Sequence, residues 1–361
     1  MENLSNNKRT EVLIDWLQVY CVGTLKKSNK FIVKELGYGT KVFISVYEIY
    51  VYNELVATLA CNPRSSALNQ KGALIKLKNS ALYCDNRIEL MKNILIELGY
   101  EFKSISRLDL CIDCNHFNNN YKPENFIKDY LQLKITKKGK NKATCHFWQS
   151  EQIEFQTLRF GKNSSNVSFY LYNKTQEMKD VRYKKYIEDN WIKSGLDVKK
   201  NVWRLECSLK GNKYKIIDKD TGLIRPVCLN DLTTTASLEG IFFHYYHRNF
   251  EFKINTADKN KSRKKNIKLF NEFYDLKDFT TSFKTDEATR MDKIFIGMME
   301  NYNCEIRLSN RYYKEDLKNI ILDYAEKKGL LEFYYKKYNE KKDIDLINFD
   351  ELKIPQIDCP F

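Results

Sequence analysis

Apolar and polar residues alternate along much of the chain, which is the pattern of β-strands that have one buried face. The stretches 12–21, 41–52 and 54–60 are rich in Val, Ile, Tyr and Thr and predict a β-meander. Further strands are expected at 107–113, 143–148, 154–160, 167–172 and 202–210. A large sheet is therefore the framework of the predicted fold.

Apolar residues recur at helical spacing in segments that lie between these strands. One such segment, 85–99, ends at Gly99, a residue type that commonly terminates helices, and another covers 124–133. A charged helix is expected near 177–194. Strands and helices in this order predict an α+β fold, in which a mixed or antiparallel sheet has helices packed on one face.

The pattern changes near residue 258. The segments 241–247 and 250–254 predict a last strand or hairpin, and the basic segment that follows them is interpreted as a solvated linker. Beyond it the pattern becomes helical, at 286–301 and 313–328. We therefore divide the chain into an α+β domain, 1–258, and a basic linker with a smaller, mainly helical C-terminal region, 259–361.

The chain has 61 Lys and Arg residues against 47 Asp and Glu residues, a net charge of +14. This excess favours a polyanionic partner, and aromatic residues, at 14%, offer surfaces on which unpaired bases stack. Lys, Asn, Ile and Tyr are all abundant, so the codon bias of an AT-rich genome is an alternative source of the same composition. The charge favours nucleic acid as the partner.

The distribution of apolar residues and cysteines bears on location. No stretch approaches the roughly 18 apolar residues of a membrane span, and the first residues do not resemble a signal peptide. The ten cysteines are scattered, and several lie within apolar strands, where thiols pack as small hydrophobic groups. We expect a cytoplasmic protein that has no membrane partner.

Two tyrosines and a lysine are the first candidate catalytic group. In a strand Tyr170, Tyr172 and Lys174 would share one face, because side chains two positions apart point the same way. A nearby cation favours the phenolate, which is the form that attacks phosphorus. The alternative is that these tyrosines are ordinary sheet residues, since the chain contains 24 of them.

Two other strands carry charged residues at alternating positions. Asp109 and Asp113 lie four residues apart, roughly 13 Å in an extended strand, so they cannot hold one ion without a bulge. A cross-strand pair such as Asp109 and Glu206 is easier, and oxygen ligands of this kind suit Mg²⁺ or Mn²⁺. The alternative is a structural ladder of ion pairs that also includes Arg107 and Arg204.

Several other kinds of site are disfavoured by the sequence. Cys111 and Cys114 would point to opposite faces of a strand, which argues against zinc. Neither GxxxxGK[ST] nor GxGxxG occurs, which argues against an ATP-driven motor and a dinucleotide enzyme. No His-hydrophobic-His triplet is present, and His244 and His247 are interpreted as structural or DNA-contacting residues.

Five segments stand in an order that resembles the replication initiation factor family, which includes rolling-circle plasmid initiators and relaxases of conjugative transposons. They are Ile14–Leu17 with its Asp15, Arg107–Asp113, Thr157–Ser165, Tyr170–Glu177 and Trp203–Lys210. In that family a Gly-Ser-x-x-Ser-like turn, a Tyr-x-Lys-x-x-x-Glu-like segment and an Arg-x-Glu strand recur in this order. The resemblance covers roughly residues 11–215, and the lack of a two-histidine motif agrees with it.

The resemblance implies roles for individual residues. It matches Tyr172 to the nicking tyrosine, Lys174 and Glu177 to its basic and acidic followers, Asp109 and Asp113 to the acidic strand, and Arg204 and Glu206 to the final strand. Two positions depart from the family pattern, since Asn173 replaces a more typical Asp and Leu171 stands where a basic residue is common. The nucleophile therefore stays open between Tyr172 and Tyr170.

The remaining expectations concern the metal and DNA. Asp109 and Glu206 are expected to bind Mg²⁺ or Mn²⁺, with Asp113 or Glu177 close by. The residues expected to contact DNA are Arg107, Lys162, Ser164, Ser165 and Arg204.

The resulting hypothesis is a rolling-circle replication initiator or relaxase of a plasmid, phage or integrated element. It would nick single-stranded or hairpin origin DNA and stay joined to the 5′ phosphate, while host helicase and polymerase extend the free 3′ end. One alternative is a filamentous-phage-type replication endonuclease. Another is a non-catalytic DNA-binding regulator with the same fold. Residues 1–258 are expected to carry the chemistry, and 259–361 to bind the duplex origin or a partner.

Overall fold

The computed structural model divides the chain into two units, Met1–Ser282 and Phe283–Phe361. The described residues are 8–137, 142–149, 153–162, 165–211, 215–217, 224–258, 260–272, 314–327, 329, 331–332 and 334–335. In the second unit the main described element is α9 (Lys314–Lys327), which confirms the helix expected at 313–328. The helix expected at 286–301 lies outside the described residues.

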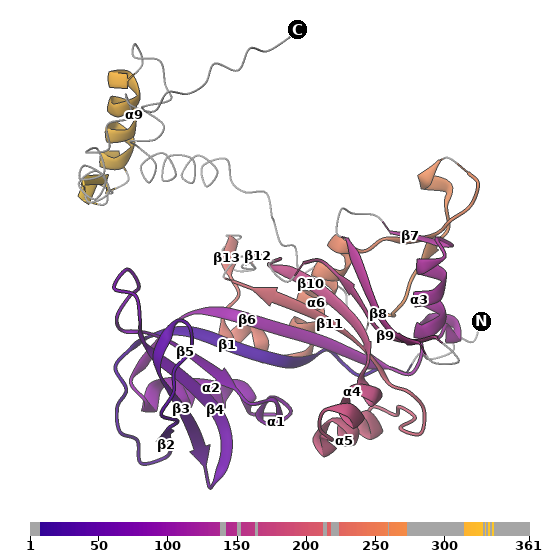
Figure 1. Cartoon of the computed structure of the whole chain (residues 1–361), viewed down its shortest axis with the longest axis horizontal. Coiled ribbons are helices and arrows are strands. Elements are labelled where there is room, and N and C mark those ends of the chain that lie inside the picture. Colours follow the sequence, from indigo (N-terminus) through magenta and orange to yellow (C-terminus); the bar gives the residue numbers. More distant parts are fainter. Residues whose placement is uncertain are drawn as a thin grey trace. The chain divides into compact units, whose positions relative to one another are not determined.

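The first unit is built on a ten-stranded sheet in which every pair of neighbouring strands is antiparallel (Figure 1). In spatial order the strands are β2 (Ile32–Glu35), β3 (Phe43–Val51), β4 (Glu54–Pro63), β5 (Gly72–Leu77), β1 (Leu13–Gly23), β6 (Tyr100–Cys114), β11 (Trp203–Lys210), β10 (Val167–Asn173), β9 (Ile153–Phe160) and β8 (Ala143–Gln149). The long strands β1 and β6 cross the middle, and β2–β5 curl at one end (Figure 1). The predicted α+β class is confirmed.

Two smaller sheets accompany the large one. The first pairs β12 (Lys215–Ile217) with β13 (Ile224–Pro226). The second has the order β15 (Asn266–Ile267), β14 (Phe252–Ile254), β7 (Ile135–Lys137), so it joins a segment that follows residue 258 to the middle of the chain.

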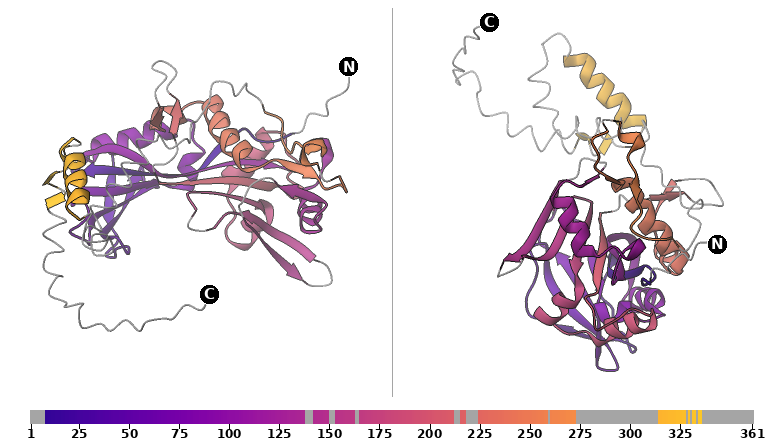
Figure 2. Two further views of the ribbon diagram at one scale, coloured as in Figure 1. Left: turned by 90° about the horizontal axis from the view of Figure 1, so that it is seen from above. Right: turned by 90° about the vertical axis from the view of Figure 1, so that its right-hand side faces the viewer.

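Helices lie on both faces of the large sheet, so the expectation that they pack on one face is wrong. On one face are α2 (Arg87–Glu97) and α6 (Thr235–Asn249), which both contact the short 3₁₀ helix η2 (Leu229–Leu232) (Figure 2). The short helices α1 (Asn79–Leu82), α4 (Lys174–Asp180) and α5 (Lys185–Lys193) lie on the other face. Beside β7 and β9 is α3 (Pro123–Leu131), and the remaining 3₁₀ turns are η1 (Asn118–Asn120) and η3 (Lys261–Arg263).

Alternation along the central strands separates a core face from a polar face. On β10, Phe169 packs against Phe242 of α6, with ring centroids 6.4 Å apart. On β6, Asp113 faces the opposite way, where Trp191 of α5 donates a hydrogen bond to it over 2.7 Å. The α6 face is therefore the apolar core, and the α5 face carries the charged residues.

Aromatic packing anchors the segment around residues 250–270 to the core. Phe250 lies 4.5 Å from Phe169 and 4.9 Å from Phe160, and Phe252 lies 5.0 Å from Phe126, measured between ring centroids. Edge-to-face pairs of this kind are stabilising beyond the apolar area that they bury.

A buried ion pair holds the two ends of the first unit together. Both Nη atoms of Arg9 donate to the Glu239 carboxylate, over 2.8 and 2.9 Å, and the backbone N–H of Val12 also donates to Glu239. Arg9 donates further to the backbone carbonyl of Asn271. The first unit therefore extends beyond residue 258, and the predicted domain boundary lies too early.

One predicted strand is wrong. Residues 241–247 belong to α6, which begins after Thr234, whose Oγ1 accepts the Ser237 N–H over 3.2 Å. The helix is buried on most sides, so its sequence shows no polar stripe, and its aromatic residues are of strand-forming type. The predicted charged helix near 177–194 is in fact two helices, α4 and α5.

No helix within the described part of the chain is long and apolar enough to span a membrane.

The packing of the segment after residue 258 generates a prediction about truncation. A chain ending at Asp258 loses Phe270, whose ring lies 5.3 Å from that of Phe117, and the carbonyl that binds Arg9. We expect its free energy of unfolding to fall by about 3 kcal/mol relative to a chain ending at Ser282. Thermal and urea unfolding followed by circular dichroism measures the difference. Equal unfolding midpoints for the two fragments would contradict this assignment.

Candidate active site

Three neighbouring strands bring the predicted site residues together on the polar face. The strand register places Tyr170 opposite Glu206, and Tyr172 opposite Arg204. On the next strand Asp113 is opposite Arg204. Because these strands lie in the middle of the sheet, the backbone positions of the site are fixed by ladder hydrogen bonds on both sides.

A direct contact links the candidate nucleophile to a carboxylate. Tyr172 Oη donates a hydrogen bond to Glu206 Oε2 over 3.1 Å. Burial, followed by the negative charge of Glu206, raises the pKa of Tyr172 well above its usual value. The phenol is therefore neutral at physiological pH, and it needs a proton acceptor before it can act as a nucleophile.

Glu206 is an acceptor that itself tends to hold a proton. Burial raises its pKa to about 8, and the negative charges of Asp15 and Asp109 act in the same direction. Arg204 and the hydrogen bond from Tyr172 act in the opposite direction but are weaker. A carboxylate whose pKa lies near the working pH is suited to general acid–base catalysis.

Arg204 is fully buried, and its guanidinium is used within the protein. Its Nε and Nη2 donate to Asp113 over 2.7 Å each, Nη2 also donates to Tyr83 Oη over 2.9 Å, and Nη1 is paired with Asp15. Trp191 Nε1 donates to the same Asp113 carboxylate over 2.7 Å. This burial argues against the predicted DNA contact of Arg204, and it gives Asp113 a structural partner in place of the predicted metal.

Asp109 is held at the other end of the site. Arg107 donates to it through Nε over 3.1 Å and Nη2 over 2.5 Å, and Ser208 Oγ donates over 2.6 Å. Burial nevertheless raises its pKa, with a further contribution from the charge of Asp15. In the strand register Asp109 is opposite Ser208, so Glu206 is its diagonal neighbour and not its direct partner as we expected.

The structure places Lys174 differently from the prediction. The strand ends at Asn173, whose side chain caps α4 by accepting the Gln176 N–H over 3.0 Å, and Lys174 is the first residue of the helix. Its Nζ binds Glu177 Oε2 over 2.6 Å and lies 5.6 Å from the centroid of the Tyr172 ring. Lys174 therefore neutralises Glu177, and it does not give Tyr172 the lowered pKa that we expected.

A cationic cluster that sequence reasoning missed lies next to Asp109. Trp16 has Lys76 Nζ 3.1 Å and the Arg107 guanidinium carbon 4.0 Å from its ring centroid. Burial, together with the positive charges of Lys78 and Arg107, lowers the pKa of Lys76 to about 8. The cluster supplies positive charge on the face that holds Tyr172.

Asp15 also lies in the site, although it was not predicted as a site residue. It occupies a β-bulge between Ile14 and Trp16, where the register with β6 shifts by one residue. Its carboxylate reaches Arg204 and accepts from Asn79 Nδ2 over 3.1 Å. The only signal in the sequence was its position in the first of the five ordered segments.

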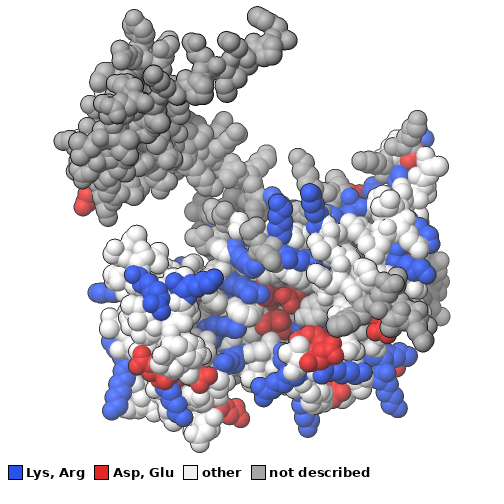
Figure 3. Space-filling view, in the orientation of Figure 1, with Lys and Arg blue, Asp and Glu red and all other residues white. Residues whose placement is uncertain are grey.

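The remaining predicted residues lie at the margin. Tyr170 has the Arg159 guanidinium 5.2 Å from its ring centroid. Lys162 is exposed, and its backbone N–H donates to Ser165 Oγ over 3.1 Å in the turn before β10. Ser164 lies outside the described residues. In the view of Figure 3, acidic side chains gather near the middle of the molecule with lysine and arginine around them.

The carboxylates of the site are candidate ligands for a divalent cation. Among the described residues, no group of three or more His, Cys, Asp or Glu side chains is arranged to hold a metal ion. The negative charges of Asp15 and Asp109 nevertheless contribute to the raised pKa of Glu206. A bound cation would reduce this repulsion between carboxylates. Mg²⁺ commonly takes one or two carboxylates and completes its shell with water and substrate phosphate, so Asp109 and Glu206 are the residues that would hold it. The Asp109 carboxylate is already bound by Arg107 and Ser208, which such an ion would have to displace.

Comparisons with known proteins give one similar solved structure to report. No protein-family model and no curated protein matches the chain. A rolling circle replication initiator protein from Geobacillus stearothermophilus is 18% identical, with a TM-score of 0.44, and the match covers 72% of this chain and 92% of that chain. The chemistry of the site has to be judged from its own residues.

The raised pKa of Glu206 predicts how stability depends on pH. The folded protein keeps this proton up to about pH 8, whereas an unperturbed Glu loses it near pH 4.5. The folded state therefore binds more protons within this window, so stability from this group falls as pH rises through it, by at most about 1.4 kcal/mol per pH unit. Glu206→Gln removes this dependence.

Urea unfolding of both proteins measures the effect at several pH values between about 5 and 9, a range that roughly brackets that window. We expect the variant to gain stability over the wild type as pH rises and the gain to level off above about pH 8. A constant difference across the range would mean that Glu206 titrates normally.

Proposed function

We propose that this chain is a tyrosine-dependent DNA nicking enzyme, acting as a rolling-circle replication initiator or relaxase. The observation that carries the proposal is the hydrogen bond from Tyr172 to Glu206, a neutral phenol paired with a carboxylate whose pKa lies near the working pH. The order of the sequence motifs and the net charge of +14 support DNA as the substrate.

The mechanism begins with the Tyr172 phenol and a backbone phosphodiester. As Tyr172 Oη attacks phosphorus, its proton passes to Glu206, and the bond between phosphorus and the 3′-oxygen breaks. The products are a 5′-phosphotyrosine and a 3′-hydroxyl, whose oxygen takes up a proton from solvent while Glu206 keeps the proton of Tyr172. Because the pKa of Glu206 is about 8, it accepts the proton only in its ionised form, and it can return that proton when the reaction is reversed or the strand is joined.

Positive side chains beside the carboxylates are suited to orient the phosphate. Arg107 is partly exposed and carries a permanent charge, and Lys76 contacts the same Trp16 ring. A Mg²⁺ or Mn²⁺ ion bound by Asp109 and Glu206 would neutralise charge that develops on the scissile phosphate. Asp113 and Glu177 are left out of this proposed metal site, because the fully buried Arg204 holds Asp113 and Lys174 holds Glu177. Asp109 is also paired, with the partly exposed Arg107, so a metal ion there would have to displace that pair.

The proposed partners follow from the reaction. Single-stranded or hairpin origin DNA is the substrate, and host helicase and polymerase would extend the free 3′ end. Such a reaction places the protein in the cytoplasm, where the replicon is. The lysines of the second unit are proposed to bind the duplex origin or a partner.

Replacing the nucleophile tests the chemistry. We expect Tyr172→Phe to abolish the denaturant-resistant adduct with single-stranded origin oligonucleotides in Mn²⁺, and to leave DNA binding within about twofold of wild type. Denaturing gels with labelled DNA measure the adduct, and fluorescence anisotropy measures binding.

The matched control is Tyr170→Phe, because Tyr170 lies on the same strand face opposite Glu206. It should retain the adduct. Loss of the adduct only in the Tyr170 variant would reassign the nucleophile, and no adduct in the wild type would favour a non-catalytic DNA-binding regulator.

The metal proposal has its own test. Asp109→Asn keeps the shape of the side chain and removes its charge, so we expect it to raise the Mn²⁺ concentration needed for half-maximal adduct formation by about tenfold. The adduct assay with titrated Mn²⁺ measures this shift, and Asp113→Asn is a comparison that disturbs the buried pair with Arg204. Undiminished adduct formation with excess chelator would contradict a metal role.

A further inference from the structure

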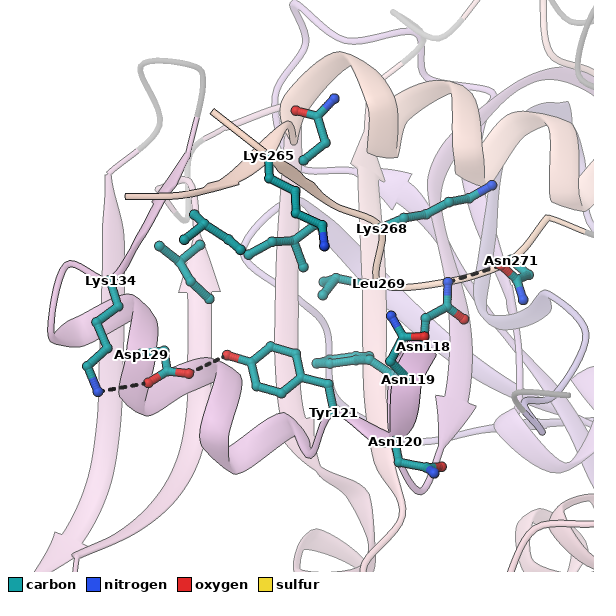
Figure 4. Close-up of a pocket in the computed structure, with 15 residues that line it drawn as sticks. Asn118, Asn119, Asn120, Tyr121, Asp129, Lys134, Lys265, Lys268, Leu269 and Asn271 are labelled. Atoms are coloured by element: carbon teal, nitrogen blue, oxygen red, sulfur yellow. Dashed lines mark hydrogen bonds and ion pairs between the residues drawn. The ribbon is translucent and has the colours of Figure 1, made fainter. Parts of the chain in front are cut away.

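A polar groove lies between η1, α3 and the three-stranded sheet β15–β14–β7 (Figure 4). It has a volume of about 1150 Å³. This is above the range of about 300–1,000 Å³ for pockets that hold one small molecule. None of the residues discussed for nicking lines it, and it has room for more than one nucleotide unit.

The charge of the groove is positive. Lys134, Lys265 and Lys268 line it, and its acidic residue, Asp129, is already bound by Lys134 over 3.4 Å and by Tyr121 Oη over 2.7 Å. Lys265 and Lys268 are exposed, and within the described part of the chain neither has an acidic partner. Their charges are therefore available to an anionic ligand, for which backbone phosphates are suitable groups.

Asparagine amides supply the other polar groups. Asn118 Nδ2 donates to Asn271 Oδ1 over 3.0 Å, which links two walls of the groove (Figure 4). Asn119 and Asn120 are exposed in left-handed conformations, with φ of 58° and 53°, in the turn that forms the rim. An amide both donates and accepts, so it can pair with the edges of unpaired bases.

The groove is held in shape by the aromatic core beneath it. Phe117, which precedes the asparagines, packs edge-to-face against Phe126 at 5.6 Å and Phe270 at 5.3 Å. The opposite wall is fixed by strand pairing between β14 and both of its neighbours. A site built on packed elements loses little conformational entropy when a ligand binds.

We infer that this groove binds a segment of single-stranded nucleic acid, as a holding site distinct from the nicking site. The lysines match phosphates, and the amides match the Watson–Crick edges of bases, which are free in a single strand and paired in a duplex. The inference stands on the groove itself and does not require that Tyr172 forms an adduct.

Binding of a labelled, short, mixed-sequence single strand to the full chain tests the inference. All proteins carry Tyr172→Phe, so that no covalent product forms and a failure of the nicking proposal cannot affect the result. We expect Lys265→Gln with Lys268→Gln to weaken binding at least about fivefold and to flatten the slope of log affinity against log salt by about 1.4, because two phosphate contacts are lost.

Two further variants distinguish charge from base recognition. Lys71→Gln with Lys193→Gln removes the same charge at exposed positions elsewhere and should change affinity less than about twofold. Asn119→Gly with Asn120→Gly keeps the left-handed turn without its amides, since glycine adopts positive φ freely. It should weaken binding without changing the salt slope.

Three outcomes would overturn the inference. The first is equal loss of affinity in the groove and control lysine variants, which would mean that only net charge matters. The second is equal or stronger binding of the matching duplex at the same groove residues. The third is full competition by deoxyadenosine monophosphate at the concentration of the strand, which would make the groove a mononucleotide pocket. Thermal unfolding midpoints equal to that of the parent protein show that each variant is folded.

Discussion

The candidate site depends on one buried cation, Arg204. A guanidinium without exposure to water is tolerated only when its charge and its N–H groups are satisfied, and Asp113, Asp15 and Tyr83 do this. These partners come from two neighbouring strands and from the segment after α1, so one side chain holds three parts of the chain in register. Two residues further along β11, Glu206 has no ion-pair partner among the residues that the structure describes. Arg204 is thereby fixed within the fold, whereas the pKa of Glu206 is raised to about 8.

Much of the framework could be predicted from the sequence. Strands with one apolar face can be recognised because apolar and polar residues alternate along them. Side chains two positions apart on a strand also share a face. This is why Tyr170 and Tyr172 were expected on one strand face, and the register places them opposite Glu206 and Arg204. The fold class follows from the same local signals, because each element can be recognised from its own residues.

The pairings within the site could not be predicted in this way. Which strand lies next to which, and in what register, depends on contacts between residues far apart in the chain, such as Arg204 with Asp15. The position of Lys174 depended on whether the strand continued past Asn173. The Asn173 side chain caps a helix instead, so the strand ends there and Lys174 is helical. In α6 the residue types favoured a strand, and burial in the core decided for a helix.

The bulge at Asp15 has a consequence for the whole of β1. Before it, Val12 and Ile14 are the buried residues, and after it, Leu17 and Val19 are, so the alternation changes from even to odd positions. In each half of the strand alternate side chains point into the core, but the buried positions are even-numbered before the bulge and odd-numbered after it. The residue inserted at the phase change is the carboxylate that meets Arg204. A regular strand of the same composition would have to send either its core residues or its acid to the wrong side of the sheet.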